Sequence, residues 1–461
     1  MTREERIVRR IPTRRESWLY AIANLGGSIP YQAFSAVVLF FYTDVKNLNP
    51  ATAATIMTVY AIWNALNNPL IGHLSDRTVS RWGRRLVYIR FGMIPFALAF
   101  AAIWLVPYDA AEHPVRVALW FLVSIIVFEG LGTAVTVAGH QSLLAEMFPS
   151  YQSRVDVAVR MNWIQTVGLF VAGALPPILA EQLGYPVMGL VFALAIIVAY
   201  AIGLRGMYEQ PSFAPVTTPF LEGVRAVLRN RSFLTVMFAQ MMRFVATNTM
   251  TSGMFFYVKY SLNGTAAETT LVLASAFVSA AVMLPVWRRF IAMRFDPRTS
   301  MTIVYGTLSI AAIPLFFVRT VEEGIIAAII VGMPVAGALL LGDVLLADVI
   351  DEDETRTGSR REAMIYSVSG AANALSAAIT ATYFGFITHL YGYDPLLTTQ
   401  PTSVGLGFRV FMMSLPMIGG LLAVLVIRFY PIHGERLARL RAFQSTNKTP
   451  SFIEGGGAGT P

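Results

Sequence analysis

Stretches of about 20 predominantly apolar residues recur along the chain from Trp18 to Tyr430. Each is long enough to cross the hydrocarbon core of a bilayer as an α-helix. Transmembrane strands are shorter and alternate apolar with polar residues, and these stretches lack that alternation. Hydrophobic residues make up 55% of the 461 residues and charged residues only 13%, too little charge to cover a soluble domain of this size. The sequence therefore predicts an all-α integral membrane protein.

We predict twelve transmembrane helices. They span residues 17–44, 51–74, 86–107, 115–146, 155–182, 186–206, 232–261, 266–292, 300–318, 323–350, 362–391 and 404–430. Lys and Arg total about 23 in the termini and even-numbered loops and about 2 in the odd-numbered loops. Because positive charge stays on the cytoplasmic side, we expect a multi-pass plasma-membrane protein (inner membrane in a bacterium) with both termini in the cytoplasm. Topology and anionic membrane lipids account for the net charge of +8, so no nucleic-acid partner is expected.

The longest predicted cytoplasmic loop divides the chain into two halves. The predicted order is a basic cytosolic arm (1–16), an N-terminal six-helix bundle (17–206), a linker with a short amphipathic surface helix (207–231), a C-terminal six-helix bundle (232–430) and a partly disordered cytosolic tail (431–461). An internal echo supports this division, since LLAE at 143–146 leaves the fourth helix and LLAD at 345–348 leaves the tenth. The arrangement resembles the major facilitator superfamily, in which two six-helix bundles rock about a site at the bilayer midplane.

Several kinds of chemistry are disfavoured by residue usage. The chain contains no cysteine, and its five histidines show no metal-ligand spacing. This excludes disulfides and thiol chemistry, and we expect no metal centre or other cofactor. No Walker-type phosphate loop occurs, so the sequence predicts neither an ATP-driven pump nor another enzyme.

The segment Trp63–Arg85, WNALNNPLIGHLSDRTVSRWGRR, joins an amide-rich apolar helix to a charged loop. Its charged residues are Asp76, Arg77, Arg81, Arg84 and Arg85. The other half carries a similar set, Asp348, Asp351, Arg360 and Arg361. Such charges can bind helix ends and carboxylates in one access state and release them in the other. We interpret both sets as gating charges, and the alternative is a solvated loop that only fixes topology.

Five segments resemble the glycoside–pentoside–hexuronide:cation symporters, the melibiose-permease family. They are YAIANLGGSIP (Tyr20–Pro30), FFYTDV (Phe40–Val45), NNPLIGHLSDRTVSRWGRR (Asn67–Arg85), LLAEMFPSYQSRVDVAVRMN (Leu143–Asn162) and ADVIDEDETRTGSRREAMIYSV (Ala347–Val368). The last is the most specific, and the resemblance runs from about residue 17 to residue 430. It implies a twelve-helix major facilitator fold and coupled transport of a sugar or glycoside.

The resemblance also exposes a departure at the cation site. In sodium-coupled members, two aspartates and an asparagine of the second helix bind the ion, together with a threonine of the fourth. The matching aspartate positions here are Asn64 and Asn68, the asparagine is Asn67 and the threonine position is Ala134. An amide carries no charge to offset a desolvated cation and exchanges no proton near neutral pH. We therefore interpret Asn64, Asn67 and Asn68 as a former cation site.

The sugar-binding positions of the family are mostly replaced as well. Ser28 and Val137 stand at aspartate positions, Gln141 at a tryptophan, Ala374 at a lysine, and only Arg160 is retained. These changes make the cavity less polar, so an amphiphilic or lysolipid-like solute is an alternative to a sugar. A non-transporting membrane receptor or assembly factor is the alternative of another class.

Ionisable residues inside membrane spans are costly and mark candidate sites. Glu129, near the middle of the fourth predicted helix, and Asp343 of the tenth are candidate proton carriers, which makes H⁺ the candidate coupling ion. Arg243 lies about eleven residues, or about 16 Å, into the seventh helix. It could face Glu129 across the cavity or form a static ion pair with it.

The remaining candidates would bind the solute. Asn24, Ser28 and Gln32 recur every four residues and share one face of the first helix. Gln141, Arg160, Arg243 and Asn373 complete the candidate set. Arg160 could bind an anionic or hydroxyl-bearing solute through its planar donor fork, or cap helix carbonyls. The expected protein is a monomeric proton symporter or uncoupled facilitator that moves a small organic solute by alternating access.

Overall fold

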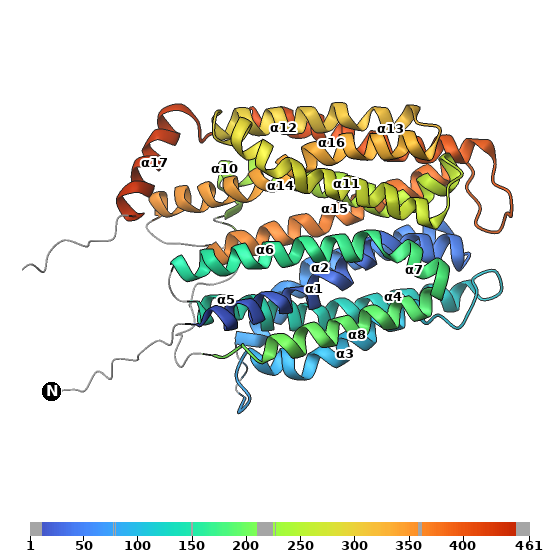
Figure 1. Ribbon diagram of the computed structural model, residues 1–461, viewed down its shortest axis with the longest axis horizontal. Helices are drawn as coiled ribbons and strands as arrows, with labels where there is room; N and C mark the ends of the chain where they lie inside the picture. The colour runs from blue at the N-terminus through green and yellow to red at the C-terminus, as the bar shows by residue number, and fades with distance from the viewer. Residues whose placement is uncertain are drawn as a thin grey trace, which may run out of the picture.

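The computed structural model describes residues 12–148, 151–209, 225 and 227–448, except residues 77, 79 and 358–361. Its described residues form helices and connecting turns, with no strand among them. The helices gather in two bundles whose long axes run side by side (Figure 1). The prediction of an all-α protein is confirmed.

The N-terminal bundle contains six helical spans in the described part of the chain. They are α1 (Arg14–Phe40) with η1 (Phe41–Val45), α2 (Pro50–Asp76), α3 (Leu86–Trp104), α4 (Pro114–Thr133) with η2 (Ala134–Gln141) and α5 (Ser142–Met147), α6 (Tyr151–Ala174) with α7 (Pro176–Leu183), and α8 (Tyr185–Leu204). The elements η1 and η2 are π-helical continuations of the α-helices before them.

The C-terminal bundle repeats this plan. Its described spans are α10 (Arg231–Phe256) with η3 (Tyr257–Ser261), α11 (Ala266–Trp287) with η4 (Arg288–Ala292), α12 (Pro297–Ala312) with α13 (Pro314–Phe317), α14 (Val321–Thr357), α15 (Glu362–Leu390) and α16 (Thr402–Ile427). A further helix, α17 (Gly434–Lys448), follows within the predicted tail. The predicted surface helix of the linker falls mostly outside the described residues.

Eight of the described spans are long and apolar enough to cross a membrane by length and composition alone. The remaining spans are α2, α6 with α7, α10 with η3, and α15. Three of them, α2, α10 and α15, place amide and hydroxyl side chains at the centre of the molecule, so their lower hydropathy reflects an interior position. The sequence of α6 contains the charged residues Arg154, Asp156 and Arg160.

Proline accounts for two departures from the predicted spans. The fifth span, predicted as one helix over 155–182, breaks after Ala174, where Pro176 and Pro177 lack the N–H donors that would continue it. The ninth, predicted over 300–318, breaks in the same way before Pro314. The tenth runs to Thr357, past its predicted end at 350, where Glu352 forms an ion pair with Arg436 of α17.

The two bundles repeat one another in detail. Tyr42 of η1 donates a hydrogen bond of 2.9 Å to the carbonyl oxygen of Ile103, near the end of the third span. Tyr257 of η3 donates one of 2.7 Å to the carbonyl oxygen of Leu315, near the end of the ninth. Both tyrosines are buried. The same contact therefore fixes the first span to the third in each half.

The bundles meet where α2 packs along α15 and α1 along α10. We call the end of the molecule at which α1 begins the Arg14 end and the opposite end the Asp44 end. Gly385 of α15 lies so close to α2 that a Cβ atom there would come within 2.9 Å of the Ala54 Cβ. A missing side chain thus brings the two backbones together towards the Asp44 end.

Candidate substrate cavity and coupling site

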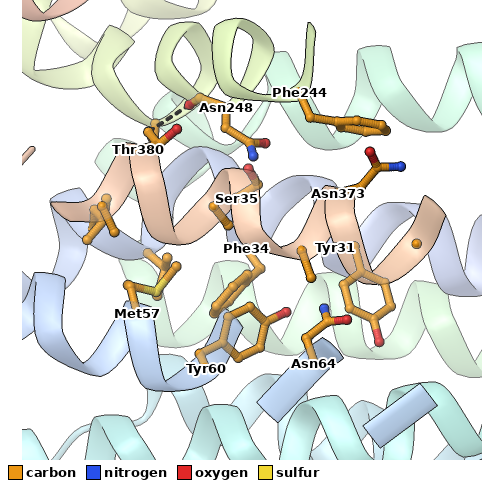
Figure 2. Close-up of a pocket in the computed structure, with 17 residues that line it drawn as sticks. Tyr31, Phe34, Ser35, Met57, Tyr60, Asn64, Phe244, Asn248, Asn373 and Thr380 are labelled. Atoms are coloured by element: carbon orange, nitrogen blue, oxygen red, sulfur yellow. Dashed lines mark hydrogen bonds between the residues drawn. The ribbon is translucent and has the colours of Figure 1, made fainter. Parts of the chain in front are cut away.

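A cavity of about 300 Å³ lies at mid-depth between the bundles, where α1, α2, α10 and α15 face one another (Figure 2). Its polar lining residues are Tyr31, Ser35, Tyr60, Asn64, Asn248, Ser252, Asn373 and Thr380. Its apolar lining includes Phe34, Leu39, Met57 and Phe244. No charged side chain is among the described residues that line it. The cavity therefore suits a solute without a fixed charge.

Helical spacing explains how the polar residues converge. Tyr60 and Asn64 are four residues apart on α2, as are Asn248 and Ser252 on α10, so each pair lies on one helix face. Of the predicted solute-binding residues, Asn373 lines the cavity, as does Asn64 of the former cation site. The other polar positions were missed, although the four-residue spacing, which also relates Tyr31 and Ser35 of α1, was visible in the sequence.

The amides at the cavity differ in how far they are satisfied. Asn248 Nδ2 donates to Ser376 Oγ at 3.1 Å, and Ser376 Oγ donates to the Asn373 carbonyl oxygen at 2.5 Å. The side-chain oxygen of Asn373 is buried and has no hydrogen-bond partner among the described residues. A buried acceptor left unpaired is costly, so this oxygen can accept a hydrogen bond from a bound hydroxyl.

Glu129 of α4 lies beside the cavity and is 2% exposed. Its Oε2 accepts a hydrogen bond from Tyr60 Oη at 2.7 Å, and its Oε1 accepts one from Thr133 Oγ1 at 3.1 Å. Its backbone oxygen accepts from Asn67 Nδ2 at 3.1 Å. Because Tyr60 also lines the cavity, one hydroxyl connects the cavity with the carboxylate.

Arg243 is buried but does not pair with Glu129 in the described structure. Its Nη2 donates to Gln240 Oε1 at 2.8 Å, and Gln240 Nε2 donates to the Gly342 carbonyl oxygen at 3.2 Å. Its guanidinium lies 4.0 Å from the ring centroid of Phe244, which lines the cavity. Arg243 therefore links the cavity wall to α14 through Gln240.

Other candidate residues lie away from the cavity. Asn24, Ser28 and Gln32 are half-buried and do not line it. Ser28 faces α6, where a Cβ on Gly168 would come within 2.7 Å of its Oγ. Gln141 is exposed, and the Arg160 guanidinium lies 5.8 Å from the ring centroid of Trp18. The structure thus does not bring these residues to Asn64 and Asn373.

The charged loop at the Arg14 end is fixed within the N-terminal bundle. The Glu209 carboxylate accepts hydrogen bonds from the backbone N–H groups of Arg84, Arg85 and Leu86 at 2.6–2.8 Å. Arg85 Nη1 donates to Ser75 Oγ at 2.7 Å, and Arg81 lies 5.1 Å from the ring centroid of Trp82.

The remaining gating and coupling candidates are only partly described. On α14, Asp348 is buried and Asp351 is half-buried. The side chains of Asp76 and Asp343, and residues Arg77, Arg360 and Arg361, lie outside the described residues. The gating role of both sets stays a prediction.

A second polar contact, at the Asp44 end, joins the two halves and was not predicted. The Asp44 side chain is 4% exposed and accepts from Lys259 Nζ at 2.5 Å. It also accepts from the hydroxyls of Tyr260 and, at 3.1 Å, Tyr393. We call these four residues the Asp44 latch. Phe40 packs beside it against Phe255 and Phe256 with centroids 5.1 Å apart.

A repeated sequence motif could have predicted the Asp44 latch. FFYTD at 40–44 and FFYVK at 255–259 occupy the same place in the two halves, with Asp44 and Lys259 in register. Residues with opposite charge at equivalent positions of two facing repeats can meet across the axis that relates them.

Residues 19–434 match the protein family described as MFS/sugar transport protein. The chain belongs to this family. The glucuronide carrier protein homolog of Escherichia coli (strain K12) is 23% identical over 91% of this chain and 93% of its own length. The sodium-dependent lysophosphatidylcholine symporter 1-A of Danio rerio is 25% identical over 91% of this chain and 86% of its own length. The predicted resemblance to the melibiose-permease-like symporters is confirmed.

Solved structures give the same fold. A bacterial homolog of the human lysosomal transporter Spinster, in an inward-facing and unoccupied conformation, aligns with a TM-score of 0.65 at 13% identity. The alignment covers 95% of this chain and all of that one. This member of the MFS/sugar transport family is therefore a multi-pass membrane transporter with the major facilitator fold, and not an enzyme. Its symporter relatives support co-transport of a small-molecule solute with a cation.

Proposed function

We propose that this transporter moves an uncharged, hydroxyl-bearing organic solute, such as a glycoside, by alternating access. The observation that carries the proposal is the cavity between the bundles, lined by amides, hydroxyls and aromatic rings without a charged side chain. Amides pair with sugar hydroxyls, and aromatic faces pack against their C–H surfaces. The free side-chain oxygen of Asn373 supplies one acceptor for such a hydroxyl.

A second candidate is an amphiphilic solute. Phe34, Leu39 and Met57 contribute apolar lining to the cavity, which would accept an acyl or alkyl group. The lysophosphatidylcholine symporter among the relatives favours this class. The small, uncharged cavity favours the glycoside, because a lysolipid brings a charged headgroup that would need a charged or strongly polar partner.

The coupling ion in this proposal is H⁺, and Glu129 carries it. A carboxylate can take up and release a proton, whereas the amides of Asn64, Asn67 and Asn68 cannot. Glu129 is connected to the cavity through the Tyr60 hydroxyl, so solute binding and protonation can influence each other. Asp343 remains a second candidate on sequence grounds.

The Asp44 latch is the gate that closes one side of the cavity. It joins η1 of one bundle to η3 and the α15–α16 segment of the other. On the charge distribution of its loops, the Arg14 end is cytoplasmic and the Asp44 end faces outwards. The protein then works as a monomer in the plasma membrane (inner membrane in a bacterium), with anionic lipids at its basic face.

Uptake into proteoliposomes tests this function. A panel of neutral glycosides, a hexuronate and a lysophospholipid would be offered with a pH gradient, a sodium gradient or neither. We expect a neutral glycoside to accumulate only with the pH gradient. Uptake of the lysophospholipid alone would select the second candidate, and sodium-driven uptake would contradict the proton proposal. Absence of flux for the whole panel would contradict both solute classes.

A further inference from the structure

A second cavity, of about 670 Å³, lies in the C-terminal bundle at the Asp44 end. It is bounded by the end of η3, the turn before α14 and the segment that leads into α16. Two arginines line it, Arg319 and Arg409, together with the polar side chains of Asn263, Thr399 and Thr402. No carboxylate is among the described residues that line it. The cavity therefore presents positive charge and hydrogen-bond donors.

Arg409 lies inside a predicted membrane span, about 10 Å along α16 from its first residue. Its Nη2 donates to the Ser261 carbonyl oxygen at 2.9 Å. Its Nε is buried and has no hydrogen-bond partner among the described residues. A guanidinium has five N–H donors, so most of this one's capacity remains available. A charged group inside a span is costly and indicates a partner.

Arg319 brings the second positive charge. Two carboxylates follow it closely in sequence, Glu322 and Glu323. Glu323 is bound to backbone, since its Oε2 accepts from the N–H groups of Arg319 at 2.8 Å and Thr320 at 3.4 Å. Neither Arg319 nor Arg409 forms an ion pair within the described part of the chain. Two guanidinium groups therefore line one cavity, and neither is ion-paired with a carboxylate of the described residues.

We propose that this cavity binds an oxyanion of the phosphate class, either as free phosphate or as the headgroup of an anionic phospholipid. Guanidinium groups bind phosphate oxygens through paired, charge-assisted hydrogen bonds. The first turn of α16 also borders the cavity, and its N-cap residue, Pro401, makes no side-chain hydrogen bond. The N-terminus of this 26-residue helix adds a favourable dipole for an anion. The site is separate from the central cavity, so it does not depend on which solute is transported.

Thermal unfolding of the full-length protein in a neutral detergent tests the site. Inorganic phosphate would be titrated at constant ionic strength into wild type, R319Q, R409Q and R116Q. We expect a saturable rise in Tm for wild type, with the apparent affinity about tenfold weaker in R319Q and in R409Q. R116Q is the matched control, because Arg116 is an exposed arginine near the Asp44 end whose guanidinium lies 5.5 Å from the Tyr108 ring centroid and does not line the cavity.

A second arm separates the two sources of phosphate. The same variants in nanodiscs would be scored for enrichment of phosphatidylglycerol over zwitterionic phosphatidylcholine. A response to free phosphate supports a soluble anion, and enrichment of phosphatidylglycerol that R319Q abolishes supports a lipid headgroup. If R409Q does not fold, R319Q alone tests the site. R319Q should fold, because the Arg319 side chain is exposed and makes no hydrogen bond in the described structure. Responses of R319Q that equal wild type in both arms, or no response of wild type in either, would overturn the proposal.

Discussion

At the scale of single residues, a carboxylate lies beside the amides of the second span, although on a different helix. The second span carries only amides at the positions where the resemblance leads one to expect acids. Glu129 of α4 lies against that span, because its carboxylate accepts from Tyr60 and its backbone oxygen from Asn67. A titratable group thus lies next to the cavity, and the proposed proton coupling rests on it.

Replacement of Glu129 by Gln should abolish the stimulation of uptake by a pH gradient. Solute exchange without a gradient should persist, because the amide oxygen can still accept the Tyr60 hydrogen bond and the amide N–H can donate to the Thr133 hydroxyl. The measurement is uptake and counterflow in proteoliposomes. E112Q is the control, since Glu112 is exposed in the loop before α4. If E129Q still accumulates solute in response to a pH gradient at the wild-type level, Glu129 is excluded as the proton carrier.

Replacement of Asn373 by Ala should raise the KM for the solute about three- to tenfold, the effect of one lost neutral hydrogen bond. The kcat should change little if the bond is made equally in the ground state and during transport. Concentration-dependent uptake measures both. Q141A should leave KM unchanged, because Gln141 is exposed and does not line the cavity. An equal rise in KM for both variants would argue against the assigned cavity.

The site was only partly predictable from sequence for a physical reason. A polar stripe such as Asn24, Ser28 and Gln32 shows that one face of a helix is polar, but not where that face points. Rotation of a helix about its axis is set by packing against its neighbours, and here Ser28 faces α6. Asn64 and Asn373 could be anticipated because the resemblance placed a cation-site position at Asn64 and a sugar-binding position at Ala374, beside Asn373.

At the scale of elements, the N-terminus of α3 and the carboxylate that caps it fix the charged loop between α2 and α3. The N-terminus of α3 leaves backbone N–H groups without intrahelical partners. Glu209, beyond the end of α8, accepts from the N–H of Leu86, the first residue of α3, and from those of Arg84 and Arg85 just before it. Its negative charge also lies at the positive end of the helix dipole. Gly83, with a φ of +98°, lets the chain turn against this carboxylate, since a Cβ there would come within 2.5 Å of its Oε1.

Replacement of Glu209 by Ala should destabilise the protein by about 1–2 kcal/mol, through loss of the cap and of its charge. Thermal unfolding in detergent measures this as a lower Tm. E435A provides the comparison, because Glu435 is exposed and forms only a helical ion pair with Arg439 at 3.6 Å. A Tm for E209A that matches E435A would show that the cap contributes nothing to stability.

The positions of the helices were largely predictable from the sequence. The points at which helices break, and the packing of α17 against α14, were less predictable. Long apolar runs indicate where helices lie, because a spanning segment must satisfy its own backbone. The breaks before Pro176 and Pro314 follow from proline chemistry but were predicted as continuous helix. The helix α17 contacts α14 through an ion pair between Arg436 and Glu352, and a contact so distant in sequence cannot be inferred from the local pattern.

At the scale of the whole molecule, the two halves are structural repeats that carry opposite charges at one equivalent position. Asp44 and Lys259 end matching FFY segments and meet between the bundles. The buried carboxylate of Asp44 needs its partners, because an unpaired buried charge is strongly unfavourable. Breaking the latch should therefore shift the balance between access states.

Replacement of Asp44 by Asn should open the cavity towards the Asp44 end. The chain has no cysteine, so a single S252C label in the cavity can report access to a membrane-impermeant maleimide. We expect D44N and K259M to raise the alkylation rate several-fold and the exchanged pair D44K/K259D to lower it again. K46M is the control, because Lys46 donates within its own bundle, to the Val106 carbonyl oxygen at 2.9 Å. Unchanged rates in D44N would remove the latch as a gate.

Alternating access itself is tested most directly by two distances measured across the bundles. Spin-label pairs at Ala111 and Leu397, exposed at the Asp44 end, and at Leu74 and Met293, exposed at the Arg14 end, can be followed by double electron–electron resonance in the cysteine-free chain. D44N should lengthen the first distance and shorten the second, relative to wild type. Distances that both stay unchanged, or that move in the same direction, would contradict transport by rocking of the two halves.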